Sequence, residues 1–292
     1  MQGRDAIPML SRRRLLLGGL LLAGASPAAA LASAGSMKPP FETAQPPSAP
    51  TPKPAASWIA YEASLQAQLA TPGGAIHLDD YGQELLVQAN VFRSKAQLTP
   101  YKWDDDLATC AKAHALDMAR RNYFGHATPE GFTHLERVAL LCRDFCGKTA
   151  ENLAWRSSQA PVRAADFEAL WEASPGHRRN LLRETFTAAG YAVVRVDDTY
   201  FAAGVYAEPS VRLARALPLW IAEGPQLRSA LEDASPAIQK VTLTSPFQQP
   251  TWMAATSAKM PALHQGAWQL RPLAPAGDGG FSALPGPTFF VS

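Results

Sequence analysis

Apolar residues recur at three- and four-residue steps in four stretches between positions 80 and 173. Such spacing puts the apolar side chains on one face of a helix, so the pattern predicts four amphipathic helices. Asp79 or Asp80 can cap the first of them, and Ser174 can cap a short helix that follows the fourth, with Pro175 at its first position. The stripes are Leu85, Leu86, Ala89 and Phe92; Leu107, Cys110, Ala111, His114 and Met118; Phe132, Leu135, Val138 or Ala139, and Leu141 or Cys142; and Val162, Ala165, Phe167, Leu170 and Trp171.

Two runs rich in β-branched and aromatic residues follow the helices, at 190–196 and 200–206. Asp197 and Asp198 separate them, which indicates a hairpin of two β-strands. Because the helices come first and the hairpin last, the order favours an α+β layered domain over a doubly wound α/β fold.

Positions 1–34 are typical of a cleaved secretion signal. Arg12 and Arg13 precede an apolar run that ends near Ala25, and small-residue cleavage sites follow. The Ser-Arg-Arg-x-Leu-Leu order resembles a twin-arginine signal, with the general secretory route as the alternative. Since the run is shorter than the ~20 apolar residues that cross a bilayer, we expect a periplasmic or extracellular protein with no permanent membrane span.

The rest of the chain divides by composition. Positions 35–57 are rich in Pro, Ala and Ser, a composition that predicts an extended linker. We expect an N-terminal helical extension at 58–79, the compact domain at 80–209, and a partly irregular C-terminal extension at 210–292.

The overall composition and net charge exclude few functions. Of 292 residues, 47% are hydrophobic and 18% charged, and the formal net charge is +2. This balance gives no signal for a polyanion, so nucleic acid is not an expected partner.

The three cysteines suggest one bridge. Disulfides persist outside the cytoplasm, and Cys142 and Cys146 lie four positions apart beside Gly147. We therefore expect these two to pair and Cys110, on an apolar stripe, to remain reduced.

Four residues between positions 122 and 180 could form one polar site: His126, Glu136, Glu151 and His177. Two neutral imidazoles with carboxylates suit zinc, which would acidify a bound water toward a pKa of ~7 and support hydrolysis. The alternative is a buried network in which each carboxylate accepts a hydrogen bond from an imidazole. His114 lies on a helical stripe and is expected to pack rather than join the site.

Familiar catalytic motifs are absent from the sequence. It contains no His-Glu-x-x-His, no Gly-x-Ser-x-Gly and no Gly-x-x-x-x-Gly-Lys. Zincin, serine-hydrolase and nucleotide-binding functions therefore lose their simplest support.

Five motifs in order resemble the CAP superfamily of cysteine-rich secretory, antigen 5 and pathogenesis-related proteins, in its bacterial exported branch. The resemblance implies an α-β-α sandwich with a central antiparallel sheet, and a cleft where two histidines meet two acidic residues. It assigns Glu136 to the first acidic position, where relatives often carry aspartate, and Glu151 to the second. Gly125 stands where many relatives have serine. The motifs are Asn90-x-x-Arg93, Leu98-x-Pro100-x-Lys102-Trp103-Asp104, Phe124-Gly125-His126, Ala150-Glu151-Asn152 and Ser174-Pro175-Gly176-His177-Arg178-x-Asn180.

Three functions in different classes stay open, and the resemblance favours the first. The leading one is an exported protein whose cleft binds a lipid, a sterol or a cell-envelope component such as the cell wall. The second is a metal-assisted hydrolase in which His126 and His177 hold zinc or another divalent cation and Glu136 or Glu151 acts as general base. The third is a structural envelope module.

Overall fold

The computed structural model describes residues 42–43, 53–71, 73–222, 224–231, 234–235, 237–245, 248–255, 263–275 and 280–292. The predicted secretion signal and most of the predicted linker lie outside these ranges. Among the described residues, no helix combines the length and the apolar character needed to cross a membrane.

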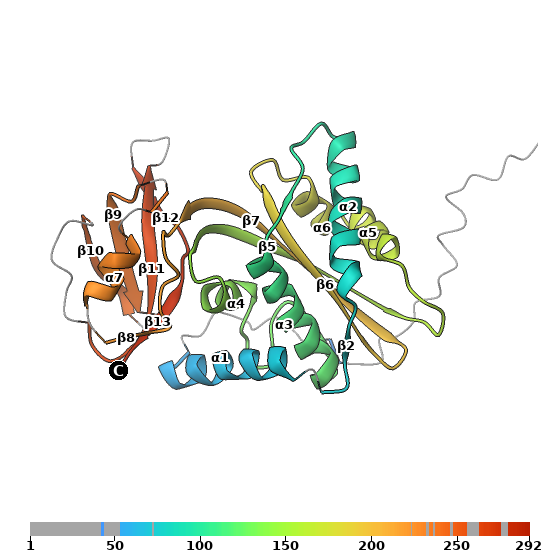
Figure 1. The fold of residues 1–292 in the computed structure, drawn as a ribbon, viewed down its shortest axis with the longest axis horizontal. Coiled ribbons are helices and arrows are strands. Elements are labelled where there is room, and N and C mark those ends of the chain that lie inside the picture. The colour runs from blue at the N-terminus through green and yellow to red at the C-terminus, as the bar shows by residue number, and fades with distance from the viewer. Residues whose placement is uncertain are drawn as a thin grey trace, which may run out of the picture. The chain divides into compact units, whose positions relative to one another are not determined.

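The predicted α-β-α sandwich is confirmed (Figure 1). Its sheet has the order β2-β6-β7-β5 with antiparallel neighbours, and the short β3 pairs with β6 in parallel. Helices α2, α5 and α6 cover one face, while α3 and α4 cover the other and α1 packs on α3. The strands are β2 (Ile76–His77), β3 (Lys102–Trp103), β5 (Phe145–Ser157), β6 (Ala188–Val196) and β7 (Thr199–Arg212), and the helices are α1 (Ala55–Ala70), α2 (Asp79–Lys95), α3 (Asp105–Arg121), α4 (His134–Leu141), α5 (Ala164–Ala173) and α6 (Pro175–Leu181).

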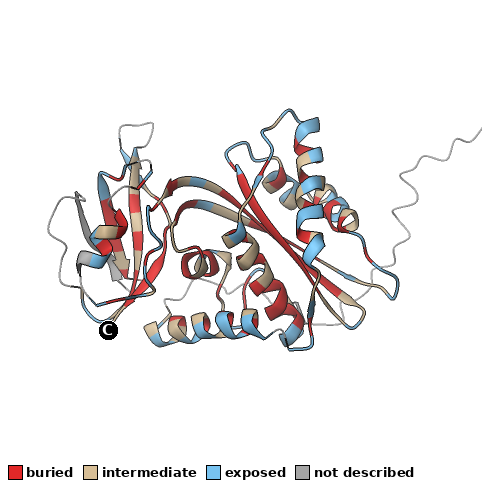
Figure 2. Ribbon diagram, in the orientation of Figure 1, coloured by how far each residue is buried: buried red, intermediate tan, exposed pale blue. Residues whose placement is uncertain are grey.

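Apolar side chains that point alternately to the two sides of the strands form a core on each face of the sheet (Figure 2). Successive side chains of a strand point to opposite faces. In β5, Leu153 thus packs toward α3 and α4, and Ala154 packs toward α2 and α5. Strands β6 and β7 alternate in the same way, which is why all residues of 188–194 and 200–207 are buried.

The helix starts differ in their chemistry. Neither Asp79 nor Asp80 caps α2, contrary to prediction: Leu78 holds the cap position without a side-chain bond, and the two aspartates stabilise the first turn through the helix dipole. Asp104 caps α3 by accepting a hydrogen bond from the Leu107 amide at 3.0 Å. The motif residue Asp104 is therefore structural.

The strand β5 is the main element that the sequence analysis missed. It pairs with β7 over its whole length, with one irregularity beside Gly147. Lys148, Glu151 and Asn152 interrupt any apolar alternation, so the pairing with β7 rather than the local pattern defines this strand.

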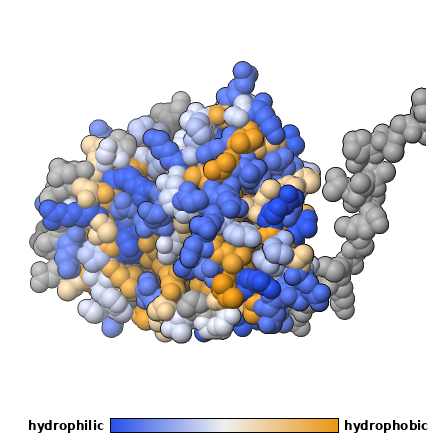
Figure 3. Space-filling view, turned by 45° about the vertical axis from the view of Figure 1, so that its right-hand side comes forward, coloured by the Kyte–Doolittle hydropathy of each residue, from blue (hydrophilic) through white to orange (hydrophobic). Residues whose placement is uncertain are grey.

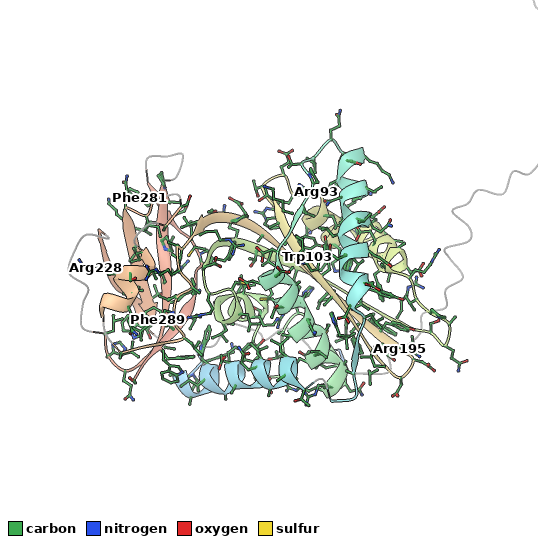
Figure 4. The ribbon with its side chains drawn as sticks, in the orientation of Figure 1. Arg93, Trp103, Arg195, Arg228, Phe281 and Phe289 are labelled. Carbon is green, nitrogen blue, oxygen red and sulfur yellow. The ribbon has the colours of Figure 1, made fainter. Side chains whose placement is uncertain are left out.

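Arg93 connects three parts of the sandwich (Figure 4). It lies on α2 and is fully buried. Its partners are all neutral carbonyl groups. Through them the guanidinium joins α2 to the chain before α3, to the end of α6 and to the chain after it. It donates to the carbonyls of Thr99, Leu181, Arg183 and Phe186.

The region after position 209 is more regular than predicted. It contains a second sheet of order β10-β9-β11-β13-β8, with β12 added beside β11. Val241, Leu243, Leu270 and Phe289 are fully buried in its own apolar cluster, and such cross-strand packing is invisible in a local pattern. The remaining elements are β1 (Glu42–Thr43), β4 (Tyr123–Phe124), β8 (Trp220–Ile221), α7 (Gly224–Leu231), β9 (Lys240–Ser245), β10 (Gln248–Ala255), β11 (Gly266–Pro275), β12 (Phe281–Ala283) and β13 (Thr288–Val291).

The predicted bridge between Cys142 and Cys146 does not form. All three cysteines are free and buried, and Cys142 contacts Cys110 instead. The two side chains lie in different apolar clusters. Cys142 follows α4 and packs with α3, whereas Cys146 packs in the cluster of the second sheet.

Candidate functional site

The site is built around Glu151 and Asn152 on strand β5. Because neighbouring side chains on a strand point to opposite faces, Glu151 faces α3 and α4 while Asn152 faces α6. Strand β5 is also the last in its sheet. Groups from the two faces can therefore approach each other around this edge.

Glu151 is buried, with 1% of its side chain exposed, and both of its oxygens are engaged. Arg137 Nη2 donates to Oε2 at 2.6 Å, and His126 Nδ1 donates to Oε1 at 2.9 Å. A carboxylate only accepts hydrogen bonds, so the proton of a neutral His126 must reside on Nδ1. The Nε2 atom then carries a lone pair, on a side chain that is 55% exposed.

The charges around Glu151 favour its ionised form. Burial works to raise the pKa of Glu151, but the Arg137 guanidinium and the surrounding imidazoles hold this pKa well below its ordinary value. The site therefore contains a permanent carboxylate matched by one permanent guanidinium.

Two further histidines line this carboxylate. His114, fully buried, donates from Nε2 to the Gly125 carbonyl at 2.8 Å and lies 3.9 Å from Glu151. Burial and the Arg137 charge lower the pKa of His114 to about 3, so it is neutral. Burial also lowers the pKa of His134, which bonds to the Thr149 backbone. His114 thus packs in a helix as predicted, but beside the site.

Helix α1 reaches the site through Tyr61. Arg137 Nη1 donates to the Tyr61 hydroxyl at 3.2 Å, so a hydrogen-bonded chain runs from Tyr61 through Arg137 and Glu151 to His126. The Tyr61 ring stacks on Phe132 at 4.1 Å between centroids, which fixes the hydroxyl. The helical extension is therefore part of the support of His126.

His177 comes from the first turn of α6, on the other face. Asn152 Nδ2 donates to the His177 carbonyl at 3.1 Å, and Asn180 Nδ2 donates to Asn152 Oδ1 at 2.9 Å. These amides tie α6 to strand β5. Burial, with the neighbouring His126, lowers the pKa of His177 below its ordinary value. His126 and His177 are thus close enough for their charges to interact.

Glu136 does not join this group. Its Oε2 atom accepts from the Thr133 amide at 2.8 Å and from the Thr133 hydroxyl at 2.6 Å, which completes a capping box at the start of α4. It also lines a pocket with Arg271 of β11. The structure thus gives Glu136 a capping role, because a carboxylate at the third helical position satisfies a free amide of its own helix.

The described residues do not supply a zinc site with three protein ligands. In the described part of the chain, no group of three His, Cys, Asp or Glu side chains could hold a metal ion. Both oxygens of Glu151 accept hydrogen bonds from Arg137 and His126. The imidazole nitrogens of His126 and His177 are therefore the remaining candidate metal ligands of the predicted site. Catalytic zinc typically has three protein ligands. Binding of a divalent cation by two histidines stays a prediction.

The sequence analysis missed Arg137 and His134. They lie three positions apart on α4, on the side that faces Glu151. An arginine within an apolar helical stripe is a usable signal, because a buried guanidinium needs hydrogen-bond acceptors. The sequence does not say whether those acceptors are a carboxylate, as for Arg137, or backbone carbonyls, as for Arg93.

The model of the cysteine-rich secretory protein (CAP) family matches residues 87–207. These residues include the whole hydrogen-bonded group around Glu151 except Tyr61. The second sheet and helix α1 lie outside the match.

Two curated relatives come from Bacillus subtilis (strain 168). The uncharacterized membrane protein YlbC is 31% identical over 113 residues, which are 39% of this chain and 31% of that protein. The uncharacterized protein YkwD is 30% identical over 115 residues, which are 39% of this chain and 42% of that protein. The chain thus spans less than half the length of either relative.

One solved structure is similar in sequence to part of this chain. An extracellular protein containing an SCP domain from Bacillus anthracis str. Ames is 30% identical, with a TM-score of 0.37, over 44% of this chain and 40% of that chain.

Proposed function

Because residues 87–207 belong to the CAP superfamily, we propose that this protein is an exported, non-catalytic binding protein that engages a lipid, a sterol or a cell-wall component. The observation that carries the proposal is the use of both candidate carboxylates for other purposes. Glu136 caps α4, and Glu151 is held by Arg137 and His126.

A hydrolase needs a group that accepts a proton from water near its working pH. Glu151 has a pKa well below its ordinary value and has no exposed oxygen, so it is a poor base. The metal-assisted hydrolase is therefore the less favoured function. The structural module would leave the exposed Nε2 of His126 without a role.

Two surfaces suit two ligand chemistries. The Nε2 lone pair of His126 accepts a hydrogen bond from a hydroxyl or amide, groups that glycans, peptides and sterols carry. A separate groove between α2 and α5 is lined by Val87, Ala164 and Ala165 together with the polar residues Gln83, Glu84, Gln88 and Arg163. Val87 is 56% exposed there, which offers apolar surface to an acyl chain.

Exposed apolar residues occur elsewhere on the molecule too. Figure 3 shows hydrophobic residues in patches between hydrophilic ones on the face that it draws. Exposure of single apolar side chains is normal for a folded protein, so the α2–α5 groove has to be tested by substitution.

The test offers the purified protein three ligands: phosphatidylglycerol vesicles, cholesterol, and insoluble peptidoglycan. Binding to one of them is expected. Val87→Asp should abolish binding of vesicles, whereas His126→Ala should weaken binding of peptidoglycan or sterol. Val87→Ala is the matched control for the groove, because it keeps the surface uncharged.

Two results would reject the proposal. One is no binding to any of the three ligands. The other is release of soluble fragments from peptidoglycan, or of fatty acid from the vesicles, that requires His126 and His177, since this would establish a hydrolase.

A further inference from the structure

Two of the three cysteines face each other across the contact between α3 and α4. The Sγ atoms of Cys110 and Cys142 are 3.5 Å apart, and both side chains are buried. Cys146 lies elsewhere: it packs with the second sheet, where a Cβ atom added at Gly286 would come within 2.8 Å of its sulfur.

We propose that Cys110 and Cys142 form the single intramolecular disulfide of the protein in an oxidising compartment. The bond requires an S–S distance of about 2.05 Å, so the sulfurs must approach by about 1.5 Å from their van der Waals contact. Rotation about the side-chain bonds supplies a movement of this size. The bridge goes beyond the proposed binding function and depends on it only through export.

The reaction is thiol–disulfide exchange with a small-molecule or protein disulfide as the oxidant. One cysteine thiolate attacks a sulfur of the oxidant, which forms a mixed disulfide and releases one thiol. The second cysteine thiolate attacks the protein sulfur of that mixed disulfide and releases the second thiol. Two protons leave the cysteines, and the oxidant disulfide takes up two electrons.

The structure also predicts when the bond forms. The contact with Cys110, together with burial, raises the pKa of Cys142, so little thiolate exists in the folded protein. A bulky oxidant cannot reach either sulfur once α3 and α4 have packed. Exchange should therefore be fast during folding and slow afterwards.

The bridge would enclose four of the residues that surround Glu151. The two cysteines are separated by 32 positions, and His114, His126, His134 and Arg137 all lie between them. Closing this loop restricts the unfolded chain. In the folded protein it would tie the segment that carries His126 to α3, on which it packs.

The test is oxidative refolding of the full chain. Urea-unfolded protein is refolded with reduced and oxidised glutathione, its remaining thiols are alkylated after unfolding, and the peptides are mapped by mass spectrometry without reduction. We expect one Cys110–Cys142 peptide and an alkylated Cys146. A bridge that includes Cys146, or three alkylated cysteines, would overturn the proposal.

Thermal unfolding gives an independent result. Dithiothreitol should lower the melting temperature of the oxidised protein by about 5–10 °C, from the entropy of a loop of this length in a chain of this size. Cys142→Ala should lose this response, and the matched variant Cys146→Ala should keep it. An unchanged response in Cys142→Ala would contradict the bridge, and if that variant does not fold, the peptide map of the unsubstituted protein decides.

Discussion

Replacing Arg137 by methionine tests the ion pair at the centre of the site. The substitution keeps an unbranched apolar stem but removes the guanidinium, whose Nη2 lies 2.6 Å from Glu151 Oε2. Arg137 has no exposed side chain and Glu151 has 1%, so water cannot replace the guanidinium. Removing one partner of such a buried pair costs about 3–5 kcal/mol of unfolding free energy.

A double-mutant cycle separates this charge effect from packing. In Arg137→Met combined with Glu151→Gln, neither charge remains, and the glutamine oxygen still accepts from His126. The double variant should therefore be more stable than the sum of the single losses predicts, with a coupling of about 1–3 kcal/mol. Urea unfolding followed by circular dichroism at pH 7 measures all four proteins.

The matched control is Arg93→Met. Arg93 is equally buried, but it donates to backbone carbonyls on the other face of the sheet. Its loss should add to that of Glu151→Gln without coupling. The reasoning is refuted if Arg137→Met costs less than about 1 kcal/mol, or if its coupling to Glu151→Gln is no larger than that of the control.

Three further predictions concern other positions. Glu168 is buried, neither oxygen has a hydrogen-bond partner in the described structure, and burial raises its pKa to about 8. An unfolded glutamate loses its proton near pH 4.3, whereas the folded Glu168 loses it near pH 8, so the free energy of unfolding should fall as pH rises between these values. Glu168→Gln should remove this fall. Measured by urea unfolding, the variant should be more stable than the unsubstituted protein by on the order of 4 kcal/mol at pH 9 and equally stable at pH 4. Gly190→Ala should lower the free energy of unfolding by roughly 3 kcal/mol or more, because the new Cβ would lie 2.0 Å from the Ala108 amide nitrogen. An unchanged urea midpoint would show that β6 and α3 are not in such close contact. Zinc should raise the melting temperature at pH 7.5 only while both His126 and His177 are present, and the effect should weaken as pH falls, because protons compete with the metal for the imidazole nitrogens; a calorimetric zinc signal that survives the double alanine variant would place the metal elsewhere.

The sequence by itself determined the elements whose signals are local. The apolar stripes predicted α2 to α5, Ser174 and Pro175 predicted α6, and Asp197-Asp198 predicted the turn of the hairpin between β6 and β7. The capping box was also readable, because Thr133-x-x-Glu136 precedes an apolar run. That signal predicts the capping role that Glu136 has in the structure.

Only the tertiary structure decided which residues surround Glu151. Strand β5 exists through its pairing with β7, and that pairing alone turns Glu151 toward α4 and Asn152 toward α6. Sequence reasoning named both Glu136 and Glu151, the first of them from the family resemblance, because it could not know which carboxylate a buried Arg137 would meet. The same holds for Cys142, whose partner 32 positions away is set by helix packing. Local patterns report one element at a time, whereas a buried charge or thiol is matched by contacts that form only when distant elements pack together.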